Sequence, residues 1–359
     1  MKKVGIITFH GAKNYGAVLQ AYALQKSVEE LGNECEIVDY ECESIKRGYK
    51  PFQFRKNDPV KSVLKSILMF RKRSLRIKRF SSFYNKLLKL SKKTYTSSTI
   101  TESKDNYDIF ITGSDQVWGP GPKGVDPDSA YFLSFADDKQ KYSYAASFGV
   151  ESLTDEKVPV IGKLLEGFQS FSVREDSAVD IVAKTSQKQA QVNIDPTFLR
   201  PASEWKKIAV TKLNTPYIVV FNVKPVKSLI SFAEKLSEEK NIPVYYITDN
   251  PQKKRKNFTY VVAPTVEEFL GYFLNATYVV TNSFHGTAFS VIFHKNMFVE
   301  FDTAKKRNNR AENLLGKLKI DREIKNANAT ETEIDWEYVD KVIAEEQKKS
   351  MDYLREITQ

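Results

Sequence analysis

Residues 278–293 read YVVTNSFHGTAFSVIF, and this stretch is the strongest predictor of the fold class. An apolar run at Tyr278–Thr281 has the length of a buried strand, and a second apolar run at 287–293 suits a helix. A short polar turn joins the two runs. A strand that passes through a turn into a helix is the building unit of parallel α/β proteins, in which helices cover the faces of a sheet.

The same alternation extends along the chain on both sides of this stretch. Strand-like and helix-like runs alternate almost throughout the 359 residues, and the sheet pattern stops and restarts near 201–216. We therefore predict two Rossmann-like domains that face a cleft, at 1–205 and 206–329, followed by a charged helical tail at 330–359. Functional residues are expected in the cleft, because strand C-termini and helix N-termini converge there.

The composition excludes several classes of protein. A hydrophobic fraction of 41% with 12% aromatic residues excludes a largely disordered chain. No apolar run approaches the about 18 residues that a membrane-spanning helix needs, so we expect a cytoplasmic protein. Cys35 and Cys42 cannot form a disulfide framework, and three histidines offer no zinc-ligand spacing. We predict neither a metal ion nor a cofactor.

The positive charge of the chain is concentrated in one segment. The net charge is +10, yet residues 59–101 carry twelve Lys and Arg and no acidic residue, so the rest of the chain sums to −2. Apolar residues recur every three or four positions through this insert, which predicts one or two amphipathic helices. A solvated basic face is the simplest interpretation; contact with an anionic membrane surface or an anionic substrate stays open. Nucleic acid is not expected, because no recognised motif accompanies the charge.

The turn at 281–287 places a histidine at the start of a helix. His285 lies beside unpaired helix N–H groups and the positive end of the helix dipole, which together favour an anion. Gly286 would let the backbone approach a ligand closely. The alternative is a structural turn in which Ser283 or Thr287 caps the helix and the histidine is incidental.

A second turn follows the strand-like run 107–112. It reads Gly-Ser-Asp-Gln-Val-Trp and places Ser114, Asp115 and Gln116 at a strand C-terminus, on the edge of the cleft. A carboxylate there could orient or deprotonate a hydroxyl group. The alternative is a turn or helix cap, with Trp118 filling the core.

The loop between the first strand and the first helix runs from His10 to Gly16. Its glycine spacing fits neither the dinucleotide nor the P-loop fingerprint. We interpret it as a polar substrate-contact loop, with a plain connection as the alternative; its candidate residues are His10, Asn14, Tyr15 and Gly16.

An arginine follows another strand-like run. The guanidinium of Arg174 suits a carboxylate or phosphate, although Glu175 or Asp176 could pair with it instead. Asp195, in an Asp-Pro-Thr sequence at the end of the first half, is interpreted as structural.

Taken with these residues, the sequence resembles the polysaccharide pyruvyl transferase family. The resemblance is carried by motifs in the same order along most of the chain: Asn14-Tyr15-Gly16-Ala17, Gly113 to Trp118, Ser172 to Glu175, Asp195-Pro196-Thr197 and Asn282 to Thr287. It implies a two-domain glycosyltransferase B-like architecture with a C-terminal helix. It also implies transfer of a pyruvyl group from phosphoenolpyruvate onto two hydroxyls of a sugar, giving a cyclic ketal and phosphate.

The resemblance assigns roles to the candidate residues. It implies that His285 acts as general acid or phosphate ligand and that Asp115 orients the attacking hydroxyl. Donor binding is expected from Arg174, Ser283, Phe284, Gly286 and Thr287, and acceptor or cleft contacts from His10, Asn14, Tyr15, Gly16, Ser114 and Gln116. Characterised relatives carry an arginine where this chain has Ser283. Either another cation such as Lys295 or Arg310 replaces it, or the donor is not phosphoenolpyruvate.

We expect a transferase that takes phosphoenolpyruvate as donor and a glycan, lipid-linked or not, as acceptor. The domain 1–205 is the expected acceptor side and 206–329 the donor side. Peripheral contact with the inner membrane face through 59–101 stays open. Two rivals remain: a sugar-nucleotide glycosyltransferase of the same fold, and a non-catalytic protein that binds glycan or membrane through its basic helix.

Overall fold

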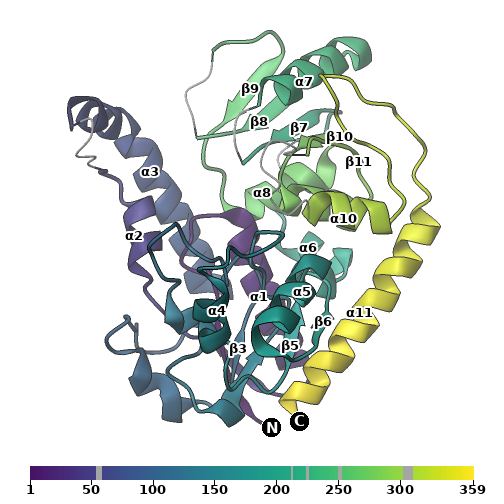
Figure 1. The fold of residues 1–359 in the computed structure, drawn as a ribbon. Coiled ribbons are helices and arrows are strands. Elements are labelled where there is room, and N and C mark those ends of the chain that lie inside the picture. The colour runs from purple at the N-terminus through teal and green to yellow at the C-terminus, as the bar shows by residue number, and fades with distance from the viewer. Residues whose placement is uncertain (54–58, 212, 224–225, 250–252, 302–309) are drawn as a thin grey trace.

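The computed structural model describes residues 1–53, 59–211, 213–223, 226–249, 253–301 and 310–359 (Figure 1). The chain forms two lobes, each built on a parallel sheet, and a long C-terminal helix that runs along both. In the described residues, no helix is long and apolar enough to cross a membrane.

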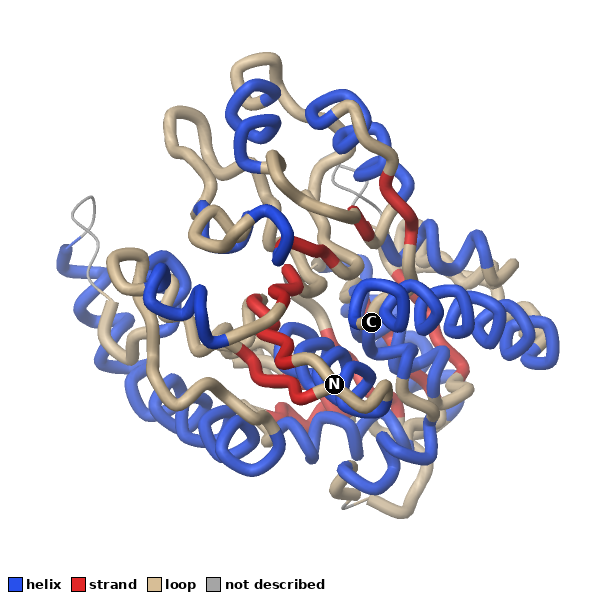
Figure 2. The backbone as a smooth tube through the Cα atoms, turned by 90° about the horizontal axis from the view of Figure 1, so that it is seen from below, coloured by secondary structure: helices blue, strands red, loops and turns tan. Residues whose placement is uncertain are grey.

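The first lobe contains a four-stranded parallel sheet in the order β2-β1-β3-β4. Its strands are β1 (Lys3–Ile7), β2 (Glu34–Ile37), β3 (Ile109–Thr112) and β4 (Lys141–Ser143). A parallel pair, β5 (Phe171–Val173) and β6 (Ala190–Val192), continues beside β4 through isolated bridges. The strands β1 and β3 are almost wholly buried because helices cover both faces of the sheet, as Figure 2 shows.

The helices of the first lobe connect and cover these strands. They are α1 (Tyr15–Glu30), α2 (Glu43–Tyr49), α3 (Pro59–Leu87), α4 (Val158–Leu164), α5 (Asp176–Ser186) and α6 (Ala202–Ile208). Short 3₁₀ helices add η1 (Ile100–Asn106), η2 (Ser129–Phe132), η3 (Asp138–Gln140) and η4 (Pro196–Leu199). The basic insert thus forms one helix of 29 residues, α3, which extends from the body of the lobe in Figure 1.

The second lobe contains a five-stranded parallel sheet in the order β11-β10-β7-β8-β9. Its strands are β7 (Ile218–Phe221), β8 (Val244–Ile247), β9 (Phe258–Val261), β10 (Tyr278–Thr281) and β11 (Asn296–Val299). Its helices are α7 (Lys227–Lys240), α8 (Val266–Asn275), α9 (Phe284–Ile292) and α10 (Arg310–Lys317). The predicted α/β class with two Rossmann-like sheets is confirmed.

The C-terminal helix α11 (Trp336–Thr358) returns from the second lobe to the first. Its apolar residues Tyr353, Leu354 and Ile357 are buried in the same cluster as Val4 and Ile6 of β1. The Ser350 hydroxyl also accepts a hydrogen bond from the Ile194 N–H of the first lobe at 3.1 Å. The tail is therefore part of the first lobe's core.

Helix α1 packs directly against the second lobe. The ring of Tyr15 stacks on Phe269 of α8 with ring centroids 4.3 Å apart, and its hydroxyl donates to the Pro264 carbonyl at 2.7 Å. Both aromatic rings belong to one large cluster that contains side chains of both lobes. This packing fixes the N-terminus of α1 against α9, which determines the geometry of the site.

Candidate functional site

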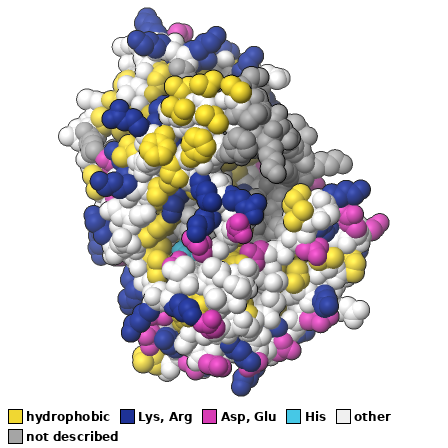
Figure 3. Space-filling view, turned by 90° about the vertical axis from the view of Figure 1, so that its left-hand side faces the viewer, with side chains coloured by type: hydrophobic (Ala, Val, Ile, Leu, Met, Phe, Trp, Pro, Cys, Tyr) yellow, Lys and Arg dark blue, Asp and Glu magenta, His cyan; other side chains and the backbone are white. Residues whose placement is uncertain are grey.

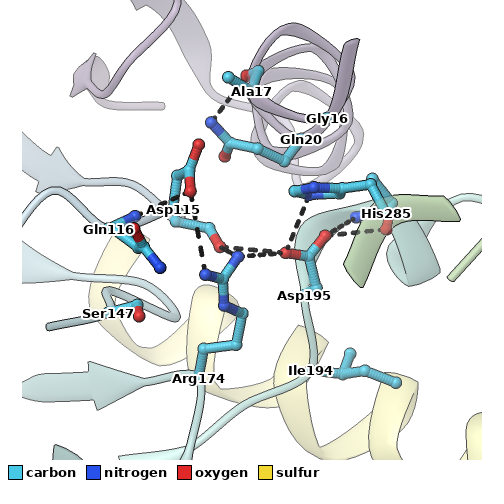
Figure 4. Close-up of polar contacts among 12 residues, drawn as sticks. Gly16, Ala17, Gln20, Asp115, Gln116, Ser147, Arg174, Ile194, Asp195 and His285 are labelled. Atoms are coloured by element: carbon cyan, nitrogen blue, oxygen red, sulfur yellow. Dashed lines mark hydrogen bonds and ion pairs between the residues drawn. The ribbon is translucent and has the colours of Figure 1, made fainter. Parts of the chain in front are cut away.

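The candidate site is centred on a buried arginine and aspartate that follow neighbouring strands. Arg174 comes directly after β5, and Asp195 follows β6 and caps η4. The Arg174 Nη1 donates to Asp195 Oδ2 at 2.9 Å and to the Ser114 hydroxyl at 3.2 Å (Figure 4). The other oxygen of Asp195 accepts hydrogen bonds from the N–H and the hydroxyl of Thr197, at 3.0 and 2.8 Å.

His285 reaches this pair from the opposite lobe. Its Nε2 lies 3.6 Å from Asp195 Oδ2, an ion-pair contact, and has no hydrogen-bond partner among the described residues. The other side of the ring packs against Gly16 in the first turn of α1, where a Cβ atom would lie 1.9 Å from His285 Nδ1. Gly16 is therefore required to leave room for the imidazole. The structure thus places the predicted histidine and guanidinium on one carboxylate oxygen.

Arg174, Asp195 and His285 form a buried charged cluster. Burial destabilises each charge in it, and the neighbouring opposite charges offset that cost. Burial alone would raise the pKa of Asp195, but His285 and Arg174 outweigh it and hold that pKa well below its ordinary value. Burial alone would lower the pKa of Arg174, but Asp195, Glu175 and Asp115 raise it, so the guanidinium stays charged. Among the described residues, Arg174 Nε and Nη2 make no hydrogen bond, but Nε lies 3.7 Å from Glu175 Oε2 and Nη2 lies 3.9 Å from Asp115 Oδ1. The ion pair with Glu175, the alternative that the sequence left open, is therefore present.

Asp115 lies at the C-terminal end of β3, beside the cluster. Its Oδ1 is 3.9 Å from Arg174 Nη2 and accepts the Gln116 N–H at 2.9 Å. Its backbone has φ of 81°, a conformation that costs a non-glycine residue about 1 kcal/mol or more. The side chain is 17% exposed, so part of it is accessible to solvent.

A second guanidinium approaches from α10. Arg310 lies over the ring of Phe284 at 5.3 Å, and Arg174 lies over the same ring at 5.0 Å. Burial and the charge of Arg174 lower the pKa of Arg310 to about 10, against the opposing influence of Asp115, Glu175 and Asp195. Arg174, Phe284 and Arg310 line a cavity of about 590 Å³, which is bounded further by Glu312, Lys317, Val342, Ile343 and Glu346.

Three of the predicted donor residues have partners within the turn itself. Ser283 is the N-cap of α9 and accepts the Gly286 N–H at 3.3 Å, and the Thr287 hydroxyl donates to the Ser283 carbonyl at 3.1 Å. A Cβ at Gly286 would lie 2.4 Å from Thr281 Oγ1. The expectation that Gly286 makes room for a ligand is therefore wrong: it makes room for Thr281. The capping alternative accounts for Ser283 and Thr287.

The predicted cleft residues separate into two groups. Ser114 and Gly16 contact the cluster directly, whereas Asn14 caps α1 by accepting the Gly16 N–H at 2.9 Å, and Tyr15 is buried between the lobes. Gln116 is exposed beside Gly149. These placements make Asn14 and Tyr15 structural rather than acceptor contacts.

His10 lies in a different cavity, of about 450 Å³, between the β1–α1 loop, α2 and α3. Its Nε2 is 3.1 Å from Asp39 Oδ1, and its Nδ1 is 3.2 Å from the Thr8 carbonyl oxygen. Lys13 lines the same cavity, and burial lowers the pKa of its amine to about 8 against the opposing influence of Asp39. The structure does not bring His10 to the Arg174 cluster.

Two residues of the cluster were not predicted as site residues from the sequence. Asp195 was interpreted as structural, and Arg310 was named as one substitute for a missing arginine. The sequence signal for Asp195 is its place in the Asp195-Pro196-Thr197 motif, whereas its contact with Arg174 depends on the pairing of Val173 with Val192 in β5 and β6. In the described residues no group of three or more His, Cys, Asp and Glu side chains could hold a metal ion.

Comparison with known proteins identifies the family of this chain. A family model described as polysaccharide pyruvyl transferase matches residues 14–299, which include the cluster residues from both lobes except Arg310. This chain belongs to that family. No curated protein matches it.

Solved structures show the fold that this family member adopts. The UDP-GlcNAc 2-epimerase of Neisseria meningitidis, bound to UDP-GlcNAc, is 9% identical with a TM-score of 0.50 and covers 99% of this chain and 94% of its own. A Listeria monocytogenes protein proposed to be a UDP-N-acetylglucosamine 2-epimerase is 12% identical with a TM-score of 0.51, covering 99% and 90%. The pyruvyl transferase family member therefore has the predicted glycosyltransferase B-like fold.

Proposed function

We propose that this enzyme transfers a pyruvyl group from phosphoenolpyruvate onto two hydroxyls of a glycan. In this reaction, C2 of the donor forms two bonds to sugar oxygens and its bond to the phosphate oxygen breaks. One hydroxyl proton ends on C3 and the other leaves with phosphate, so the products are a cyclic ketal and inorganic phosphate. The family membership supports the enzyme class, and the charges of the cluster support this donor.

The observation that carries the proposal is the pair of guanidiniums on Phe284. Arg174 and Arg310 line one cavity with that ring, and burial and Arg174 lower the pKa of Arg310 more than the nearby carboxylates raise it. Asp115, Glu175 and Asp195 offset the charge of Arg174, and Arg310 adds a second desolvated cation that an anion in the cavity would stabilise. Phosphoenolpyruvate carries a carboxylate and a phosphate, both of which suit the planar donors of a guanidinium.

Arg310 can also replace the arginine that relatives carry at the position of Ser283. Where relatives carry an arginine, this chain has the capping serine, and the cation is instead supplied from α10. The other candidate, Lys295, precedes β11 and does not line the cavity. Its pKa is lowered by burial and by Lys206, which makes it a poor substitute.

We assign the chemistry to His285 and Asp115. Protonated His285 can donate to the leaving phosphate from Nε2, which makes no hydrogen bond and lies 3.6 Å from Asp195 Oδ2, and the charge of Asp195 stabilises the protonated ring. Asp115, partly exposed and held in a strained backbone, accepts the proton of the attacking hydroxyl. The second lobe supplies His285, Phe284 and Arg310, so we assign the donor to it and the glycan acceptor to the first lobe.

Thermal unfolding tests the donor. Phosphoenolpyruvate should raise the Tm of the wild type, and Arg310→Gln should weaken its binding by about 10- to 100-fold, the size expected for one charge-assisted contact. Arg47→Gln, which removes an exposed arginine of α2, is the matched control and should bind as the wild type does. If UDP-GlcNAc stabilises the protein and phosphoenolpyruvate does not, the reaction is instead that of a sugar-nucleotide glycosyltransferase.

Turnover is tested by phosphate release from phosphoenolpyruvate with a panel of soluble and lipid-linked glycans. His285→Ala should abolish release while the Tm and the circular dichroism spectrum stay close to those of the wild type. Full activity of a folded His285→Ala variant would remove the site assignment.

A further inference from the structure

Helix α3 exposes an apolar stripe on the side that faces away from the molecule. Its members recur at helical spacing on one face over about 23 Å of helix. Their exposed fractions are 69% for Val60, 56% for Leu64, 62% for Ile67, 78% for Leu68 and 38% for Leu75. Large apolar side chains gathered this way on a surface indicate a partner that covers them.

The stripe is exposed because α3 packs against the rest of the protein through its opposite face. Phe80, Phe83 and Tyr84 are buried in the core cluster that both lobes share. On the same side, Arg76 donates to the Lys13 carbonyl and forms an ion pair with Asp249 of the second lobe. One face of the helix is thus packed against the two lobes, and the other face is exposed.

Basic side chains accompany the stripe. Arg71 and Lys78 are exposed on the same helical face, and Lys65 and Lys72 flank it. Within the described chain, none of these four cations forms an ion pair. By contrast, Lys89 and Lys93 at the end of the segment pair with Glu29 and Glu102. Figure 3 looks onto this side of the molecule and shows hydrophobic side chains gathered among Lys and Arg.

We infer that this face of α3 docks on the surface of an anionic lipid bilayer. An interfacial helix lies in the membrane plane with apolar side chains in the acyl boundary and cations at the headgroups, and the stripe of α3 has both. A second copy of the chain placed face to face would bring two sets of cations together, since residues 59–101 contain no acid. The phosphates of a nucleic acid would bind the cations but would leave the leucine side chains exposed to water.

The docking helix is tied directly to the candidate site. The Tyr84 hydroxyl donates to the Ala12 carbonyl at 3.0 Å, and Arg76 holds the next residue, Lys13, in the loop that leads to Gly16 and His285. A bilayer bound to α3 would therefore set the orientation of the cleft relative to the lipid surface. This inference does not depend on which group the enzyme transfers.

Co-sedimentation with vesicles tests it. The full chain should bind vesicles of phosphatidylcholine with 30% phosphatidylglycerol at low salt, bind pure phosphatidylcholine weakly, and be released by high salt. Leu64→Gln/Leu68→Gln should reduce binding at least tenfold. Arg71→Gln/Lys78→Gln should reduce it roughly 30-fold, as two lost surface charges predict. The matched control, Lys348→Gln/Lys349→Gln, removes two exposed charges from α11 and should bind as the wild type does.

Each remaining outcome would contradict the inference. Absence of binding to the anionic vesicles, equal binding to both lipids, or unchanged binding of both α3 variants would each overturn it. So would light scattering that shows a dimer without lipid which Leu64→Gln/Leu68→Gln dissociates, because the stripe would then be a contact between copies. Circular dichroism and Tm confirm that each variant is folded.

Discussion

Gly16→Ala tests whether the position of the imidazole, rather than its presence, determines activity. Gly16 lies in the first turn of α1 and has the ring of His285 against its Cα. The added Cβ would lie 1.9 Å from Nδ1, 2.3 Å from Cγ and 2.6 Å from Cε1 of that ring. Because ordinary contact begins near 3.4 Å, the ring must move by about 1.5 Å.

The expected magnitudes for activity and stability differ. A displacement of about 1 Å in a catalytic group costs on the order of 100-fold in kcat, or about 2.7 kcal/mol in the barrier. Overpacking beside the ring costs about 1–3 kcal/mol of stability, and alanine in place of a helical glycine returns up to about 1 kcal/mol. We therefore expect a loss of at least 100-fold in kcat with a Tm only a few degrees lower.

Phosphate release with an accepted glycan measures kcat, and Gly11→Ala is the matched control. Gly11 lies in the same loop region, and a Cβ there would meet no atom within 4 Å. The Tm of the double variant Gly16→Ala/His285→Ala should be no lower than that of His285→Ala, because the added Cβ then meets no imidazole ring. Wild-type kcat in Gly16→Ala, or a lower Tm in the double variant than in His285→Ala, would refute this reasoning.

Two further predictions concern charge. Asp195→Asn should lower the unfolding free energy by about 3 kcal/mol at neutral pH, since it leaves the buried Arg174 without its closest counter-ion. The pKa of Asp195 is depressed in the folded state, so its contribution is present above the unfolded pKa, near 4, and is lost as pH falls further. Stability of the wild type and of Asp195→Asn, measured by urea unfolding, should therefore converge in acid, and a constant difference down to pH 2 would contradict this account. Lys13, with a pKa of about 8, should react with an amine reagent at pH 8 faster than the exposed Lys348; mass spectrometry that shows identical pH profiles for the two amines would be the contrary result.

The fold could be predicted in its main features because parallel strands buried on both faces require continuous apolar runs. The run Tyr278–Thr281 is β10, and the polar turn after it opens α9 three residues earlier than the apolar pattern indicated. The difference arises because Ser283 caps the helix, so residues 284–287 form its first turn. The basic insert was also predicted as amphipathic, but its single helix has apolar residues on both its inner and outer faces.

The sequence by itself indicated which apolar runs form strands, and so which polar side chains follow them and could reach a cleft. Tertiary structure decided which of them meet. Packing of Tyr15 on Phe269 brings Gly16 against His285, and pairing of β5 with β6 brings Arg174 against Asp195. Neither contact follows from local pattern, because each depends on how separate segments pack, and that is set by the shape and burial of whole faces rather than by residue spacing.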